Sequence, residues 1–125
     1  MIVGLGIDLM ESSRFATELQ RGAWQGADGV FAPSEIKYCN AGQHPERRYA
    51  ACFATKEATL KALGAELADT GMLREVEVRL NHEHHDAIVL RGRLQAIATG
   101  LGVEQIHFSL AMQKTNVAAM VILEC

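Results

Sequence analysis

A long helical pattern over residues 45–64 constrains the fold more than any other feature of the sequence. Pro45 stands at its start and Gly64 at its end, which are the residue types that favour a first helical turn and a helix C-terminus. Its apolar side chains follow a period of about 3.6 residues. The pattern includes Tyr49, Phe53, Leu60, Leu63 and Leu67. The rest of the chain is therefore expected to pack against this helix.

Shorter elements surround this segment on both sides. We expect a buried strand over residues 2–8 that ends on Asp8, a helix over 11–22, a loop over 23–33, a helix from Pro33 to Gly42, strands over 75–80 and 87–92 joined by a turn over 81–86, a helix over 93–102, and strands over 106–111 and 116–124 joined by a turn. No repeat or linker divides residues 1–125, so one domain is expected. The fold class is α+β, a mostly antiparallel sheet packed against one long helix and shorter helices.

Composition excludes several classes of function. The chain has 12 Lys and Arg against 15 Asp and Glu, a net charge of -3, which gives no basic field for nucleic acid. No apolar run reaches the roughly 18 residues of a membrane span. The apolar N-terminus meets Asp8 and Glu11, unlike a signal peptide, and the three cysteines, Cys39, Cys52 and Cys125, show no metal spacing. We therefore expect a cytoplasmic protein with reduced thiols.

The long helix carries charge on a face that is otherwise suited to a core. Phe53, Glu57 and Lys61 are spaced by four and share a face, whereas Lys56 is turned by about 100° toward the angle of Leu60. One interpretation is a surface Glu57–Lys61 pair that contributes about 0.2–0.5 kcal/mol. The alternative is that Glu57 borders buried structure, where a carboxylate requires compensation by Lys61, a metal or both.

Asp8 is the second notable carboxylate. It allows two interpretations, a helix N-cap or a ligand for a hard cation. Magnesium typically takes one or two carboxylates and completes its shell with water and substrate phosphates. Asp8 and Glu57 with two nearby lysines would form a coherent set for phosphate chemistry.

Three segments together resemble one known family. They are "GLGIDLMESSRF", "FATKEATLKALG" and "IHFSLAMQKTNVAAMVILE". In this order they are similar to the holo-acyl-carrier-protein synthase family of phosphopantetheinyl transferases. The resemblance covers nearly the whole chain, and its most specific part runs from Phe53 to Lys61. It implies transfer of 4′-phosphopantetheine from coenzyme A to a serine of an apo acyl carrier protein, with release of adenosine 3′,5′-bisphosphate.

The resemblance also implies roles for single residues. Asp8 and Glu57 would hold Mg²⁺, and Glu57 and Lys61 would be catalytic, with either Glu57 or a metal-bound water as the base. Arg14 and Arg21 would bind the acidic carrier protein. The implied coenzyme A-binding set is Lys56, Lys61, Arg47, Arg48, His107 and Ser109. The family also implies a homotrimer with active sites between subunits.

The sequence departs from the family at three places. Cys52 stands where the family usually has Arg, Met112 where it has His, and "HEHHDAIV" where a Gly-x-Pro turn is usual. Cys52 and Met112 motivate an alternative, in which a weakened or non-enzymatic member binds coenzyme A or a carrier protein. The metal carboxylates and the helix lysines are kept, so catalysis remains the preferred interpretation. A further alternative is a generic α+β domain with a structural Glu57–Lys61 pair. The histidines of "NHEHHD", His82, His84 and His85, are interpreted as a solvated turn.

Overall fold

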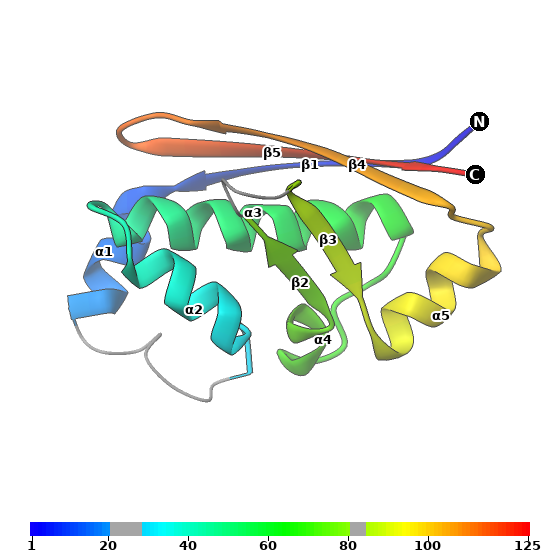
Figure 1. The fold of residues 1–125 in the computed structure, drawn as a ribbon, viewed down its shortest axis with the longest axis horizontal. Coiled ribbons are helices and arrows are strands. Elements are labelled where there is room, and N and C mark those ends of the chain that lie inside the picture. Colours follow the sequence, from blue (N-terminus) through cyan, green and yellow to red (C-terminus); the bar gives the residue numbers. More distant parts are fainter. Residues whose placement is uncertain (21–28, 81–84) are drawn as a thin grey trace.

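The computed structural model describes residues 1–20, 29–80 and 85–125 (Figure 1). Within them the chain forms five strands and five helices. In chain order these are β1 (Ile2–Glu11), α1 (Ser12–Gln20), α2 (Pro33–Asn40), α3 (Pro45–Leu63), α4 (Gly71–Arg74), β2 (Val76–Arg79), β3 (Ala87–Leu90), α5 (Gly92–Gly100), β4 (Gln105–Met112) and β5 (Asn116–Glu124).

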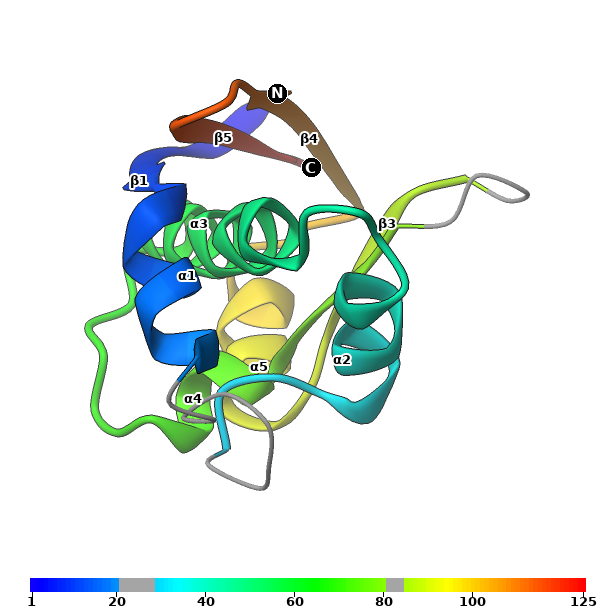
Figure 2. The same cartoon turned by 90° about the vertical axis from the view of Figure 1, so that its left-hand side faces the viewer.

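The strands form two antiparallel sheets. One has three strands in the order β1-β5-β4, so the first strand of the chain pairs with the last. The other is the β2–β3 hairpin. Helix α3 runs along one face of the three-stranded sheet, and the shorter helices and the hairpin lie on the far side of α3 (Figures 1 and 2). The long helix is therefore the middle layer of the molecule.

Glycine allows β1 to lie directly against α3. A Cβ atom placed on Gly6 would lie 1.9 Å from the carbonyl oxygen of Ala58, and one on Gly4 would lie 2.0 Å from that of Ala62. Any larger residue would push strand and helix apart. This close approach holds the next residue on the same face of β1, Asp8, against the middle of α3.

Helix α3 is surrounded by protein along most of its length. More than half of its 19 residues are buried, including Tyr49, Thr55 and Thr59. The two threonine hydroxyls donate to the carbonyl oxygens four residues earlier, each at 2.7 Å. The helix ends at a left-handed Gly64, and the amide of Ala65 donates to the carbonyl of Leu60 at 2.9 Å.

The expected fold class is confirmed, with differences in detail. The strands form two sheets instead of one, and β1 continues three residues beyond Asp8 because it pairs with β5 as far as Glu11 and Asn116. Leu67 lies beyond the end of α3 and is 49% exposed, so its place in the helical pattern was wrong. The short helix α4 was not predicted. Among the described residues, no helix combines the length and apolarity that crossing a membrane requires.

Candidate active site

Asp8 lies inside β1 and faces α3. Its backbone is paired with Ala119, and α1 begins only at Ser12. The prediction that Asp8 ends the strand is therefore wrong, and an N-cap role is excluded by the four-residue separation from the helix. The side chain of Asp8 is 14% exposed. It is thus a largely buried carboxylate on the strand face that packs against the long helix.

Lys61 is the direct partner of Asp8. Its ammonium lies 3.0 Å from Asp8 Oδ1 and donates to the carbonyl oxygen of Ile7 at 3.1 Å. The Lys61 side chain is 54% exposed. The lysine therefore joins α3 to β1, and the predicted pair with Glu57 on its own helix is replaced by a pair across 53 residues of sequence.

Glu57 lies beside this ion pair. Burial raises the pKa of the Glu57 carboxyl, the negative charge of Asp8 raises it further, and Lys61 and Arg14 oppose the effect. Within the described residues, Glu57 forms no ion pair closer than 4.0 Å. Asp8 Oδ2 is buried and likewise has no hydrogen-bond partner there. Two carboxylates thus share a site in which one ammonium satisfies only part of their combined hydrogen-bonding capacity.

This donor set suits a small divalent cation. Carboxylate oxygens are ligands that magnesium prefers, and one or two of them suffice when water and phosphate complete the shell. In the described parts of the chain, no cluster of three or more Asp, Glu, His or Cys residues could form an all-protein cage. The unpartnered Oδ2 atom of Asp8 and the adjacent Glu57 therefore fit an open site of the kind in which a phosphate ligand contributes to the coordination.

Lys56 does not belong to this cluster. Its side chain is fully buried and its ammonium lies 2.8 Å from Glu35 Oε1 of α2. It also donates to the carbonyl oxygens of Leu73 and Val76. An ammonium enclosed in this way cannot reach a phosphate at Asp8. The structure therefore does not support the expectation that Lys56 contacts coenzyme A. It gives Lys56 a structural role as the buried partner of Glu35.

Glu35 was missed in the sequence. Its carboxylate accepts from the amide of Ala32 at 2.7 Å and from that of Val78 at 2.8 Å. Together, Glu35 and Lys56 satisfy backbone groups of Val76 and Val78 on the edge of β2 that does not face β3. A buried ion pair thus takes the place of a neighbouring strand. The sequence held one signal for the burial of Lys56. Its position around the helix places it on the same face as the core residue Leu60.

Arg47 and Arg48 lie at the N-terminal end of α3, apart from Asp8. With Gln43, His44 and Met112 they line a cavity of about 450 Å³. Arg47 Nε is buried without a hydrogen-bond partner among the described residues. Arg48 donates to the carbonyl of Tyr38 at 2.7 Å and lies 4.2 Å from the centre of its ring. Arg47 therefore has a buried donor without a partner in the described structure, whereas Arg48 is anchored to Tyr38.

His107 and Ser109 lie on the other face of the three-stranded sheet. Ile106, Phe108 and Leu110 of β4 point toward the core, and the alternating residues are exposed. His107 Nε2 lies 3.3 Å from Glu124 Oε1. One copy of the chain therefore does not bring His107 or Ser109 to the cluster of Asp8, Glu57 and Lys61.

The remaining predicted residues are on the periphery. Arg14 of α1 is exposed, its guanidinium is 3.9 Å from Met10 Sδ, and its charge acts on Glu57. Arg21, His82 and His84 lie outside the described residues. His85 is exposed, in agreement with a solvated turn.

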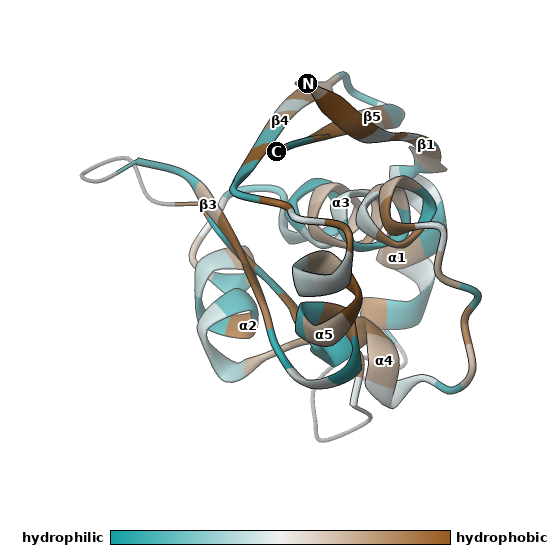
Figure 3. Ribbon diagram, turned by 90° about the vertical axis from the view of Figure 1, so that its right-hand side faces the viewer, coloured by the Kyte–Doolittle hydropathy of each residue, from teal (hydrophilic) through white to brown (hydrophobic). Residues whose placement is uncertain are grey.

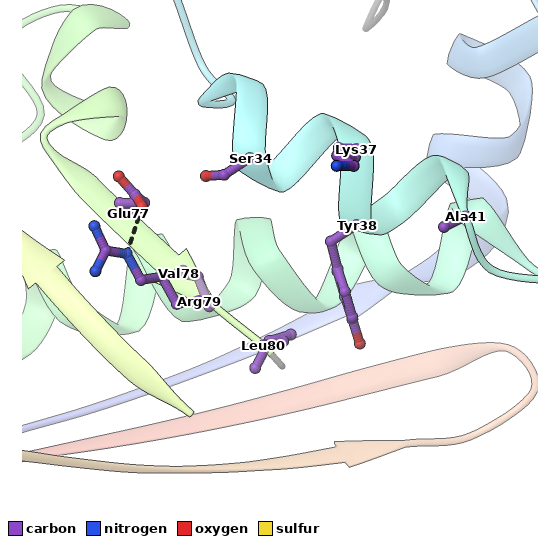
Figure 4. A pocket seen from close by; sticks show the side chains of 8 residues that line it. All are labelled: Ser34, Lys37, Tyr38, Ala41, Glu77, Val78, Arg79 and Leu80. Atoms are coloured by element: carbon purple, nitrogen blue, oxygen red, sulfur yellow. Dashed lines mark hydrogen bonds and ion pairs between the residues drawn. The ribbon is translucent and has the colours of Figure 1, made fainter. Parts of the chain in front are cut away.

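A second cavity, of about 420 Å³, lies between α2 and β2 (Figure 4). Its walls are formed by side chains between Ser34 and Ala41 and between Glu77 and Leu80. None of the predicted site residues lines it. It is therefore separate from the cluster at Asp8.

Comparison with known proteins identifies the family and the fold. Residues 4–119 match the family model of the 4′-phosphopantetheinyl transferase superfamily. A holo-[acyl-carrier-protein] synthase of Koribacter versatilis is 34% identical over 99% of both chains. The holo-[acyl-carrier-protein] synthase of Neisseria meningitidis has a TM-score of 0.83 at 22% identity, with 100% of both chains covered. The holo-(acyl-carrier-protein) synthase of Bacillus anthracis, solved in complex with CoA (3′,5′-ADP), has a TM-score of 0.74 at 24% identity, with 98% of this chain and 96% of that chain covered. The chain therefore belongs to the 4′-phosphopantetheinyl transferase superfamily.

Proposed function

We propose that the protein transfers 4′-phosphopantetheine from coenzyme A to a serine of an apo acyl carrier protein and releases adenosine 3′,5′-bisphosphate. The observation that carries the proposal is the cluster of Asp8, Glu57 and Lys61, in a chain whose Koribacter relative is a holo-[acyl-carrier-protein] synthase. Phosphoryl transfer depends mainly on positioning and on neutralising negative charge. The two carboxylates and the lysine have the chemistry for both tasks.

Magnesium is part of this proposal. Asp8 Oδ2 and the Glu57 carboxylate are the groups that would hold it. When bound, it would supply positive charge against the pyrophosphate of coenzyme A. Lys61, which is half exposed, can add its ammonium to the same phosphate oxygens. Either the Glu57 carboxylate or a water molecule can accept the proton of the attacking serine.

The cavity lined by Arg47 and Arg48 provides a second anion site for coenzyme A. Arg47 is our choice for a phosphate contact because its Nε has no partner in the described structure. Arg48 positions the wall of the cavity through Tyr38 and contributes charge. Coenzyme A carries a 3′-phosphate in addition to its pyrophosphate. This 3′-phosphate is the anionic group that we propose for the cavity.

We further propose that the protein is a homotrimer. The outer face of the three-stranded sheet carries apolar side chains in adjacent rows, in which Leu5 pairs with Ile122 and Ile7 with Met120. Figure 3 shows hydrophobic colouring along much of β1 and β5. Leu5, Ile7 and Leu9 are 52%, 49% and 73% exposed. Exposed apolar patches of this kind mark interaction surfaces. Burial of this face between copies would also bring His107 and Ser109 of one copy next to another copy.

Ile7→Asp tests the trimer. The substitution should reduce the molar mass measured by light scattering from trimer to monomer and abolish transfer. Leu67→Asp is the matched control because Leu67 has the same 49% exposure but lies outside the sheet. A monomeric wild type with full activity would reject the trimer proposal.

Helix α1 is the proposed docking surface for the acidic carrier protein. Arg14 lies close enough to Glu57 to affect its pKa, so a carrier bound there would bring its serine near the cluster. Arg21 is the second proposed contact. Arg14→Glu is expected to raise KM for the carrier protein at least tenfold and to leave KM for coenzyme A unchanged. An equal effect on both KM values would contradict this docking mode.

The decisive experiment measures the intact mass of several apo carrier proteins after incubation with the protein, coenzyme A and Mg²⁺. Each carrier that is a substrate gains one phosphopantetheine group. Glu57→Gln should reduce the rate by on the order of 100-fold, whereas Glu66→Gln, the same change at an exposed position beyond α3, should have no effect. No mass gain on any carrier, with folded protein, would refute the proposed activity.

One observation favours a second candidate, a member that binds coenzyme A without transfer. The thiol of Cys52 is fully buried against α2, so the chain has no cation at the position where the family usually has Arg. Coenzyme A binding measured by calorimetry, together with no transfer to any carrier, would support this alternative. In either case we propose that the protein acts in the cytoplasm, the reducing compartment that suits its sparse, odd number of cysteines.

A further inference from the structure

Two of the three cysteines form a buried pair. Cys39 of α2 and Cys52 of α3 have their sulfur atoms 3.8 Å apart, and both residues are 0% exposed. A disulfide requires an S–S distance of about 2.04 Å, so closing the pair needs a movement of roughly 2 Å. Cys125 is exposed at the C-terminus and lies apart from this pair.

The contacts around the pair hold the two helices in a fixed relation. On one side, Tyr49 donates to Asn40 Oδ1 at 3.0 Å, and on the other, Lys56 is paired with Glu35 at 2.8 Å. The thiols lie between these two links and therefore face each other whenever α2 is docked. In the described parts of the chain, no third metal-ligating side chain joins them to form a metal site. The geometry favours bond formation between the sulfur atoms over metal binding.

We propose that Cys39 and Cys52 form a reversible intramolecular disulfide when the protein is exposed to a peroxide. The first sulfur, as a thiolate, attacks one peroxide oxygen, the O–O bond breaks, and a sulfenic acid forms with loss of one water or alcohol. The second thiol then attacks this sulfur, the S–O bond breaks, and a second water leaves with the remaining thiol proton. In total, two electrons pass from the two sulfurs to the peroxide, and one S–S bond replaces two S–H bonds.

Burial determines how readily this reaction occurs. The hydrogen bond with Cys52 and burial both raise the pKa of the Cys39 thiol, so the reactive thiolate is scarce while α2 is packed against α3. A peroxide also has to reach sulfur atoms that are covered by α2. The reaction therefore proceeds when α2 moves away from α3, and the bond then fixes α2 to the half of α3 that carries Arg47 and Arg48. This inference is independent of the proposed transferase activity.

Peptide mapping tests the bond directly. In a Cys125→Ser background, the folded protein is treated with hydrogen peroxide, denatured, alkylated with iodoacetamide and digested with trypsin. Lys37, Arg47, Arg48 and Lys56 place the two cysteines on separate peptides, residues 38–47 and 49–56. The expected product is one linked pair of these peptides, together with the loss of two hydrogens from the intact mass and recovery of both thiols after dithiothreitol.

Thermal unfolding gives the second readout. Cys39 and Cys52 are 13 residues apart in the sequence. A disulfide that closes a loop of this length should raise Tm by on the order of 10 °C relative to the reduced protein. Cys39→Ala and Cys52→Ala, each in the Cys125→Ser background, should show no such increase after peroxide and give no linked peptides. The proposal is overturned if both cysteines remain alkylatable after peroxide, if they are oxidised only to sulfinic or sulfonic acids, or if the linkage forms between two molecules.

Discussion

Lys56→Met should destabilise the protein far more than it affects catalysis. The substitution leaves the Glu35 carboxylate buried without its cation and removes the donor to the carbonyls of Leu73 and Val76. Removing one partner of a buried ion pair typically costs about 3–5 kcal/mol. Since small domains are stable by about 5–15 kcal/mol, this is a large fraction of the total.

Urea unfolding followed by circular dichroism measures the effect. With a slope of about 2 kcal/mol per molar urea, the midpoint should fall by roughly 2 M. Glu35→Met/Lys56→Met should be less destabilised than the sum of the two single variants, by about 2 kcal/mol or more, because it leaves no unpaired charge in the core. A midpoint for Lys56→Met within about 0.5 M of wild type at an unchanged slope, or strict additivity in the cycle, would refute the reasoning.

The same variant separates a structural from a substrate-binding lysine. In the folded fraction at low temperature, Lys56→Met should keep a KM for coenzyme A close to that of wild type. Lys61→Met should lose on the order of 100-fold in kcat, because its ammonium lies at Asp8. A selective rise in the KM of Lys56→Met would restore the original expectation that Lys56 binds coenzyme A.

Three further predictions concern other parts of the molecule. Gly6→Ala should destabilise by about 1–3 kcal/mol or more, measured by urea unfolding, because its Cβ atom would lie 1.9 Å from the carbonyl oxygen of Ala58; wild-type stability would contradict the close approach. Hydrogen bonds from Arg79 and, to a smaller extent, Arg91 keep the pKa of Glu77 below its ordinary 4.5. The difference in unfolding free energy between wild type and Glu77→Gln should therefore be fully present above about pH 4.5 and be lost as the pH falls through the lowered pKa. A difference that does not change from about pH 7 to about pH 3 would contradict this pH dependence. Arg47→Ala should raise KM for coenzyme A about tenfold with little change in kcat, and an unchanged KM would remove Arg47 from the site.

Much of the fold was predictable because it depends on local patterns. The period of the apolar residues defined α3, and Pro45 and Gly64 marked its ends within one residue. Alternation and turn residues predicted the hairpin and the last two strands. The end of β1 could not be predicted, because its last three residues are held in the strand by pairing with β5, more than 100 residues away in the sequence.

The chemical groups of the site could be read from the amino-acid sequence: two carboxylates and a lysine on elements that face a core, in the order of a known family. Their partners depend on the tertiary structure. Lys61 pairs with Asp8 across 53 residues, and Lys56 pairs with Glu35 of another helix. A helical period gives the direction in which a side chain points but not the element that packs there. Partner choice depends on that packing, because a buried charge must be satisfied by whichever groups the fold brings to it.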